Sequence, residues 1–242
     1  MFDHVTIRVS DRAESERFYG TLLRTLGVEQ SHSGGHFAEW DDFSLAAADT
    51  EHGVTQGLHI GFAARSRAQV DEFWNAGRAA GYRGDGAPGP RPQYHADYYG
   101  AFMLDPDDSS AEAVWHGALR ARGAIDHLWI RVADVAAAKR FYEAVARHAG
   151  FRLQVDKPEY VQFARESGSF SLVAGQPAEN VHLASPVEDD ETVAAFHEAL
   201  TAAGYADNGA PGERPIYHEG YYGAFVLDPD GNNVELVNHN RG

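Results

Sequence analysis

The 242-residue chain has no cysteine and only two methionines. It therefore has no disulfide framework, no thiolate nucleophile and no sulfur ligand for a metal, so any metal must be held by His, Asp or Glu. Basic residues are also few, with 20 Lys and Arg against 36 Asp and Glu and a formal net charge of -16. This charge disfavours contact with nucleic acid or an anionic membrane surface.

Long apolar runs are absent as well, since none approaches the roughly 20 residues of a membrane helix. Residues 1–6 lack the basic and apolar regions of a signal peptide. With no disulfides to form, the sequence predicts a cytoplasmic protein, and its charge predicts no nucleic-acid or membrane partner. Hydrophobic residues at 43% and charged residues at 23% are ordinary for a globular chain.

A tandem repeat organises the sequence. Residues 86–107 and 209–230 are identical at seventeen of twenty-two positions, with an offset of 123. The same offset relates Asp3-His4 to Asp126-His127. We therefore predict two domains, 1–119 and 124–242, that are copies of one unit.

Each copy is itself doubled. His4, His59, His127 and His182 are each followed by a Phe fourteen residues later, and residues 4–9 alternate between apolar and polar as a half-buried strand does. Apolar positions at helical spacing come next, and then short strand-like runs such as residues 43–48 and 99–104. The sequence predicts an α+β fold made of four β-α-β-β-β modules.

Two groups of possible metal ligands recur at the same spacing. In the first copy, 55 residues separate His4 from His59 and 53 separate His59 from Glu112. The second copy has the same spacings between His127, His182 and Glu235. Two imidazoles and one carboxylate form a facial set that leaves positions open on Fe(II) or a similar ion. A single strand His is more often structural, but the repetition favours ligands.

These residues, with the run from Tyr98 to Glu112 and its second copy, resemble the vicinal oxygen chelate superfamily of glyoxalases, bleomycin resistance proteins and extradiol dioxygenases. The resemblance implies two tandem domains whose paired modules form curled mixed sheets around a divalent metal. It implies one ligand triad of His4, His59 and Glu112 and another of His127, His182 and Glu235. Fe(II) is the favoured ion, with Mn, Ni or Zn as alternatives.

Branches of the family differ in the residues around the metal. The extradiol signature is matched by His218, Asp228-Pro229 and Glu235, but Phe225 stands where the signature has its Tyr, as Phe102 does in the first copy. Tyr99 and Tyr222 are therefore candidates to replace it. The strand runs that carry Ser44 and Ser171 contain no carboxylate, which counts against the fourth ligand typical of glyoxalases.

Further candidates flank the expected ligands. His95 and His218 precede paired tyrosines, where a His can exchange protons at neutral pH or can fix the loop. In a strand, one Tyr of each pair faces the metal and the other faces the helices. Arg91 and Arg214 follow a Gly-Ala-Pro-Gly loop and can bind a substrate carboxylate or brace the loop.

Three functions remain open from the sequence. The first is an oxygenase whose substrate chelates the metal through two neighbouring oxygens. The second is a redox-silent lyase, isomerase or resistance enzyme, and the third is a protein that sequesters a small molecule. We expect a monomer or a homodimer, because a covalent tandem can supply the pairing that single-copy relatives obtain by dimerising.

Overall fold

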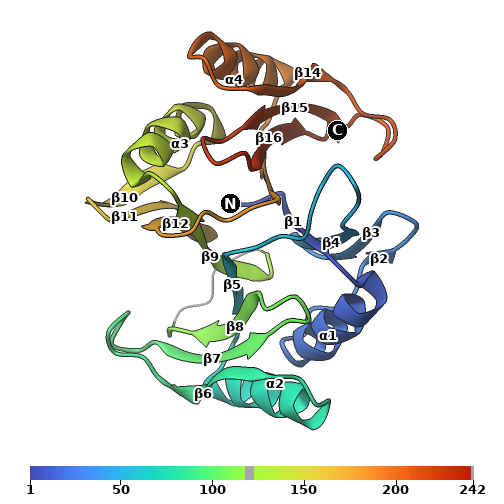
Figure 1. Cartoon of the computed structure of the whole chain (residues 1–242), viewed down its shortest axis with the longest axis vertical. Helices are drawn as coiled ribbons and strands as arrows, with labels where there is room; N and C mark the ends of the chain where they lie inside the picture. Colours follow the sequence, from blue (N-terminus) through green and yellow to red (C-terminus); the bar gives the residue numbers. More distant parts are fainter. Residues whose placement is uncertain (118–122, 241–242) are drawn as a thin grey trace.

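A computed structural model of the protein describes residues 1–117 and 123–240. Helices α1 to α4 lie at the periphery and most of the strands lie between them (Figure 1). The first module contains β1 (His4–Val9), α1 (Arg12–Thr25), β2 (His32–Ser33), β3 (Phe37–Trp40) and β4 (Phe43–Ala47). The second contains β5 (Leu58–Ala63), α2 (Arg67–Ala79), β6 (Gly84–Pro90), β7 (Tyr99–Leu104) and β8 (Ser110–Trp115).

The second half of the chain repeats this order. The third module contains β9 (Ile125–Val132), α3 (Val135–Ala149), β10 (Arg152–Lys157), β11 (Tyr160–Arg165) and β12 (Gly168–Ala174). The fourth contains β13 (Val181–Pro186), α4 (Asp190–Ala202), β14 (Asp207–Glu213), β15 (Tyr222–Leu227) and β16 (Asn233–Asn238). The predicted α+β fold of four β-α-β-β-β modules is confirmed.

Helix ends follow the local chemistry that the sequence offers. Asp11 caps α1 by accepting a hydrogen bond from the backbone N–H of Glu14, and Ser66 caps α2 in the same way with Gln69. The inner side of α1 buries Phe18, Leu22 and other apolar side chains. A Cβ added to Gly77 of α2 would lie 3.0 Å from Leu22 Cδ2, so this glycine lets α1 and α2 pack closely.

The modules pair across the two repeats. One mixed sheet has the strand order β14-β15-β16-β13-β1-β4-β3-β2, and the other has β10-β11-β12-β9-β5-β8-β7-β6. The first module therefore shares a sheet with the fourth, and the second shares one with the third. The joins are antiparallel pairs, β1 with β13 and β5 with β9. Segments 1–119 and 124–242 are repeats in sequence, but each sheet takes half of its strands from each segment.

One element differs from the sequence prediction. The Gly-Ala-Pro-Gly segments, interpreted as loops, lie in the edge strands β6 and β14. Their pairing with β7 and β15 is irregular, with register shifts at Gly86 and Gly209. Glycine and proline weaken strand propensity, but they are tolerated at an irregular sheet edge.

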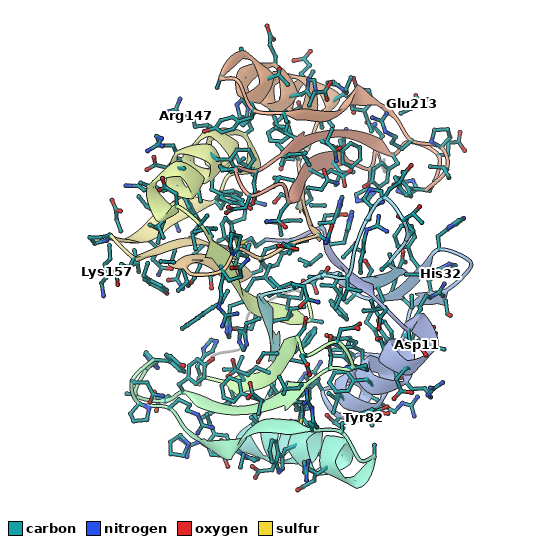
Figure 2. The ribbon with its side chains drawn as sticks, in the orientation of Figure 1. Asp11, His32, Tyr82, Arg147, Lys157 and Glu213 are labelled. Carbon is teal, nitrogen blue, oxygen red and sulfur yellow. The ribbon has the colours of Figure 1, made fainter. Side chains whose placement is uncertain are left out.

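Charged side chains gather on the outer surface. Arg147, Lys157 and Glu213 are exposed and lie at the periphery in Figure 2. No helix in the described part of the chain is long and apolar enough to cross a membrane.

Candidate metal centres

The first centre lies where β1, β13 and β16 are neighbours in one sheet. It consists of His4, His182 and Glu235, whose ligand atoms lie within 4.8 Å of one another. The Nε2 atoms of His4 and His182 are 3.0 Å apart. Glu235 Oε2 lies 3.0 Å from Nε2 of His182 and 3.7 Å from Nε2 of His4. Three potential ligand atoms therefore converge on one point.

The second centre repeats this arrangement in the other sheet. His59 of β5, Glu112 of β8 and His127 of β9 also have their ligand atoms within 4.8 Å of one another. Glu112 Oε2 lies 3.0 Å from Nε2 of His59 and 3.5 Å from Nε2 of His127. Glu112 is 1% exposed and His127 is 8% exposed, so these two ligands are buried.

All six predicted ligands are present at the two centres, but the predicted grouping is wrong. The sequence placed His4 with His59 and Glu112, whereas the structure places it with His182 and Glu235. The reason is the antiparallel pairing of β1 with β13, which sets His4 opposite Ala184. Because both copies carry the same ligand types at the same spacing, their sequences fit either grouping.

Glycines on the neighbouring strands make room for the carboxylates. A Cβ on Gly100 would lie 2.3 Å from Glu112 Oε1, and one on Gly223 would lie 2.6 Å from Glu235 Oε1. A Cβ on Gly61 would lie 2.3 Å from the His127 ring. Larger residues at these positions would displace the ligand side chains.

Carboxylates orient one imidazole at each centre. Asp3 Oδ2 lies 2.8 Å from Nδ1 of His4, and Asp126 Oδ2 lies 2.9 Å from Nδ1 of His127. An ionised carboxylate only accepts hydrogen bonds, so Nδ1 carries a proton, and in the neutral ring that a metal requires the Nε2 lone pair would point into the centre. The sequence analysis quoted the Asp-His pairs as repeat markers but missed this role.

Burial and charge shift the pKa values of these groups in opposite directions. Burial lowers the pKa of His127, but the hydrogen bonds with Asp126 and Glu112 outweigh it and raise the pKa to about 9. Burial lowers the pKa of His59 despite its contact with Glu112. Burial raises the pKa of Glu112, but hydrogen bonds from His127 and His59 lower it overall. The second centre thus keeps Glu112 as a buried anion beside two imidazoles.

The tyrosine that faces each centre is the first of its pair. The Tyr98 hydroxyl donates to Glu112 Oε1 at 2.8 Å, and the Tyr221 hydroxyl donates to Glu235 Oε1 at 2.7 Å. Burial and the charge of Glu112 raise the pKa of Tyr98 far above its usual value, so the phenol keeps its proton.

The predicted roles of Tyr99 and Tyr222 do not fit this geometry. The Tyr99 hydroxyl donates instead to Asp71 of α2 at 2.8 Å, and the Tyr222 side chain packs against the hydrophobic core. Side chains alternate along a strand, so one residue of each pair must face the helix. The alternation was predicted, but the member assigned to the metal was wrong.

The two candidate arginines lie beside phenylalanines and brace their own loops. Arg91 donates to the carbonyl oxygen of Ala87 at 2.8 Å, and its guanidinium lies 5.4 Å from the centre of the Phe102 ring. Arg214 repeats these contacts with Ala210 and Phe225. Arg91 also lines the cavity of the second centre, so its role toward a substrate stays a prediction.

The predicted proton-transfer histidines differ between the centres. His218 Nε2 lies 2.8 Å from Nδ1 of His239, and His239 Nε2 lies 2.7 Å from Oδ1 of Asp3, which contacts His4. In the second centre His116 contacts Asp126 at 2.9 Å. His95, however, lies in an exposed loop and accepts from the Asp97 backbone N–H.

The remaining residues of the motif are structural. Asp105 accepts hydrogen bonds from the backbone N–H groups of Asp107 and Ser109 and from the buried Tyr19 hydroxyl. Asp228 accepts from Tyr142 in the second repeat. The aspartates of the Asp-Pro turns therefore attach a helix to the turn between two strands. Neither is among the residues that converge at the metal centres in the described part of the chain.

The residues present suit a divalent cation at both centres. Nitrogen and carboxylate oxygen are the ordinary ligands of such ions, and a cation would satisfy two ring nitrogens that face each other at 3.0 Å. Ser44 and Ser171 occupy the strand positions where a fourth carboxylate is expected, and both hydroxyls are hydrogen-bonded to neighbours. Each centre therefore offers three protein ligands.

A cavity opens onto the second centre. Its volume is about 520 Å³, within the range of small-ligand sites. His59, Glu112 and His127 lie on its wall together with the aromatic side chains of Phe102 and Trp129. A small planar substrate can therefore reach the ligand atoms.

Comparison with known proteins agrees with this architecture. The sequence model of the Glyoxalase/Bleomycin resistance protein/Dioxygenase superfamily matches residues 1–112 and 124–236. The protein named "Uncharacterized protein YqjT" from Bacillus subtilis strain 168 is 31% identical over 133 residues, which cover 46% of this chain and 95% of that protein.

Solved structures share the fold over the whole chain. Glyoxalase I from Zea mays superposes with a TM-score of 0.71 at 20% identity, covering 98% of this chain and 92% of its own. A putative dioxygenase from Bacillus subtilis superposes with a TM-score of 0.70 at 11% identity, covering 100% and 86%. At these identities the similarity establishes the fold and not the reaction.

Proposed function

Because the chain belongs to the Glyoxalase/Bleomycin resistance protein/Dioxygenase superfamily, we propose that it is a divalent-metal-dependent enzyme, specifically an oxygenase. Its substrate is a small molecule that chelates the metal through two neighbouring oxygens. The observation that carries this proposal is the convergence of two imidazoles and one carboxylate at each centre.

The number of ligands favours oxygenase chemistry. With Ser44 and Ser171 in place of a fourth carboxylate, three coordination positions stay open on an octahedral ion. Open positions would allow a chelating substrate to reach the ion and leave room for a second reactant, which is why Fe(II) is favoured over Mn, Ni or Zn. A bound Fe(II) ion would supply Lewis acidity and an accessible redox couple.

The surrounding residues have distinct tasks in this proposal. Tyr98 and Tyr221 hold the ligand carboxylates by donating to the oxygen that does not face the imidazoles. Arg91 and Arg214 receive an anionic group of the substrate at the rim. His218, which contacts His239 beside Asp3, exchanges protons with solvent at the first centre.

The experiment is oxygen uptake by metal-stripped protein reconstituted anaerobically with Fe(II). Catechols and enediols are added before air, and Glu112→Ala and Glu235→Ala serve as controls that each remove one centre. We expect uptake that depends on both substrate and Fe(II) and falls in at least one of the variants.

Turnover without oxygen would contradict the oxygenase and favour the redox-silent lyase or isomerase. Ligand binding that is unchanged in both Glu variants, with no turnover, would instead favour the sequestering protein. The two alternatives are thus separated from the proposal by the same set of samples.

A further inference from the structure

The two centres differ in the residues that line them. At the position two residues after the first ligand, β9 of the second centre carries Trp129 whereas β1 of the first centre carries Thr6. One strand further along each sheet, beyond β12 and β4, Gln162 of β11 corresponds to Glu39 of β3. Both pairs of positions are related by the offset of 123, so equivalent positions of the two repeats carry different side chains.

Trp129 builds an aromatic wall in the cavity of the second centre. Its ring lies 5.8 Å from Tyr94, 6.2 Å from Tyr160 and 6.2 Å from His59, measured between ring centroids. The three interplanar angles are 80°, 62° and 66°, so these rings meet the indole at steep angles and do not stack on it. Trp129 also lines the cavity and is only partly buried, so its indole offers aromatic surface to a planar ligand.

The guanidinium group of Arg131 lies two residues beyond Trp129 on the same face of β9. Arg131 lines the same cavity and donates to the carbonyl oxygen of Gly57 at 3.3 Å. Among the described residues no carboxylate lies within 4.0 Å of Arg131, whereas its counterpart Arg8 pairs with Asp49 at 3.4 Å. Three carboxylates line the cavity: the ligand Glu112, Asp85, and Asp108, which contacts Arg83. Arg131 is thus available to an anionic substituent.

The first centre has the opposite character. Thr6 is buried, and its hydroxyl is 2.7 Å from that of Ser44, so it presents no aromatic surface. Glu39 lies opposite Ser44, and Ser44 lies opposite Thr6, so the carboxylate is on the same face of the sheet as Thr6. In the second centre the corresponding Gln162 is neutral and its amide lies 3.5 Å from Ser171.

We propose that the two centres take different ligands and that the second centre binds a planar aromatic carboxylate, with Trp129 as the residue that determines this specificity. Stacking on the indole selects the ring, and Arg131 selects the carboxylate. At the first centre Glu39 repels an anionic group and Thr6 offers no stacking surface. This inference rests on the proposed function, because the ligand is placed beside the second metal.

The test uses three probes with protein reconstituted with redox-silent Mn(II). Salicylate has the ring and the charge, 2-hydroxycyclohexanecarboxylate keeps the donor atoms without the aromatic ring, and salicylamide removes the carboxylate. Calorimetric titration gives the affinity and the number of sites, and the metal content of each sample is measured separately. The same probes are titrated into metal-free protein.

We expect salicylate to bind at one site per chain and more tightly than either analogue. Trp129→Thr should weaken salicylate binding about tenfold, with little effect on the saturated analogue. Gln162→Glu adds a negative charge with little change in side-chain size, on the face of the sheet that carries Trp129. It should also weaken salicylate binding about tenfold, by charge repulsion. Thr6→Ser in the other centre is the matched control and should leave the affinity unchanged.

Two equal salicylate sites, or an unchanged affinity in both Trp129→Thr and Gln162→Glu with full metal content, would overturn the inference and leave the proposed function intact. Failure to bind metal would instead contradict the proposed function. In that case the metal-free titration decides the inference, because the wall and Arg131 are still present. A preference there for salicylate over its saturated analogue supports it, and no preference overturns it.

Discussion

At the scale of single residues, each centre depends on an aspartate next to a ligand in sequence. Neighbouring residues of a regular strand point to opposite faces, so Asp126 and His127 would normally diverge. The pairing of β5 with β9 shifts register between Gly61 and Phe62, which leaves Asp126 as an extra residue. This bulge is what allows the Asp126 carboxylate to reach the His127 ring.

The tyrosine contacts give a prediction at the same scale. Tyr98→Phe removes the hydrogen bond to Glu112, and we expect the metal affinity of the second centre to fall about tenfold. Competition with a chromophoric chelator measures it. Tyr99→Phe is the matched control, since that hydroxyl contacts Asp71 on the helix side, and an equal loss in this variant would contradict the assignment.

Residue types and their spacing predicted the ligands of the two centres, but not which tyrosine contacts each centre. The six ligands were predictable because His and Glu recur at fixed spacing in both copies. The choice between Tyr98 and Tyr99 depends on which face of β7 meets Glu112, and the alternation of a strand does not reveal its phase. His239 and His116 also recur at the offset of 123, a signal that could have identified them as partners of the aspartates.

At the scale of elements, the repeated turns hold helices in place. Tyr19 of α1 donates to Asp105 at the turn between β7 and β8, and the hydroxyl and carboxylate are both buried. Because α1 belongs to the first module and this turn to the second, the contact links the two sheets. Tyr142 and Asp228 link the third and fourth modules in the same way.

Removing one of these contacts should lower stability without affecting the centres. Tyr19→Phe leaves the buried Asp105 with one hydrogen bond fewer, and we expect the free energy of unfolding to fall by about 1–3 kcal/mol. Urea denaturation measures the change, and metal content should stay the same. Tyr82→Phe is the control, since its hydroxyl has no hydrogen-bond partner among the described residues and its ring packs on Phe18. An equal loss in both variants would contradict the role of Tyr19.

At the scale of the whole molecule, the chain crosses between sheets where the second repeat begins. Asp42, which precedes β4 in the first sheet, accepts hydrogen bonds from the backbone N–H groups of Ala124 and Ile125 at the start of β9 in the second. A Cβ on Gly123 would lie 2.1 Å from Asp42 Oδ2, so only glycine allows this approach.

This junction makes stability depend on pH. Burial raises the pKa of Asp42 from 3.8 to about 7, although its backbone hydrogen bonds oppose the shift. The pKa of Asp42 is higher in the folded than in the unfolded protein. Its contribution to the free energy of unfolding is therefore greatest below pH 4 and is lost as pH rises to about 7. Asp42→Asn keeps an acceptor oxygen and should gain stability relative to the wild type between pH 5 and pH 8.

The gain is at most about 4 kcal/mol, from about 1.4 kcal/mol per pKa unit. Urea denaturation of both proteins across this range measures the difference in their free energies of unfolding. Titratable groups common to both proteins do not contribute to this difference. Asp41→Asn, at the exposed neighbouring position, removes only a minor electrostatic contribution to the raised pKa of Asp42 and should show a much weaker trend. A difference between wild type and Asp42→Asn that does not change with pH would contradict the account.

The assembly of the modules was the part that sequence could not determine. Periodicity and helix caps such as Asp11 predict four modules, since these signals are local. The choice of β13 as the partner of β1 depends on long-range packing, and β5 offers the same His and the same alternation.

Metal counting in double variants tests this cross-repeat assembly most directly. His4→Ala with Glu235→Ala damages only the first centre, so we expect one equivalent of metal to remain bound per chain. His4→Ala with Glu112→Ala damages both centres, and we expect none to remain. The opposite pattern, with metal retained by the second double variant and lost from the first, would show that each repeat builds its own centre and would contradict the account.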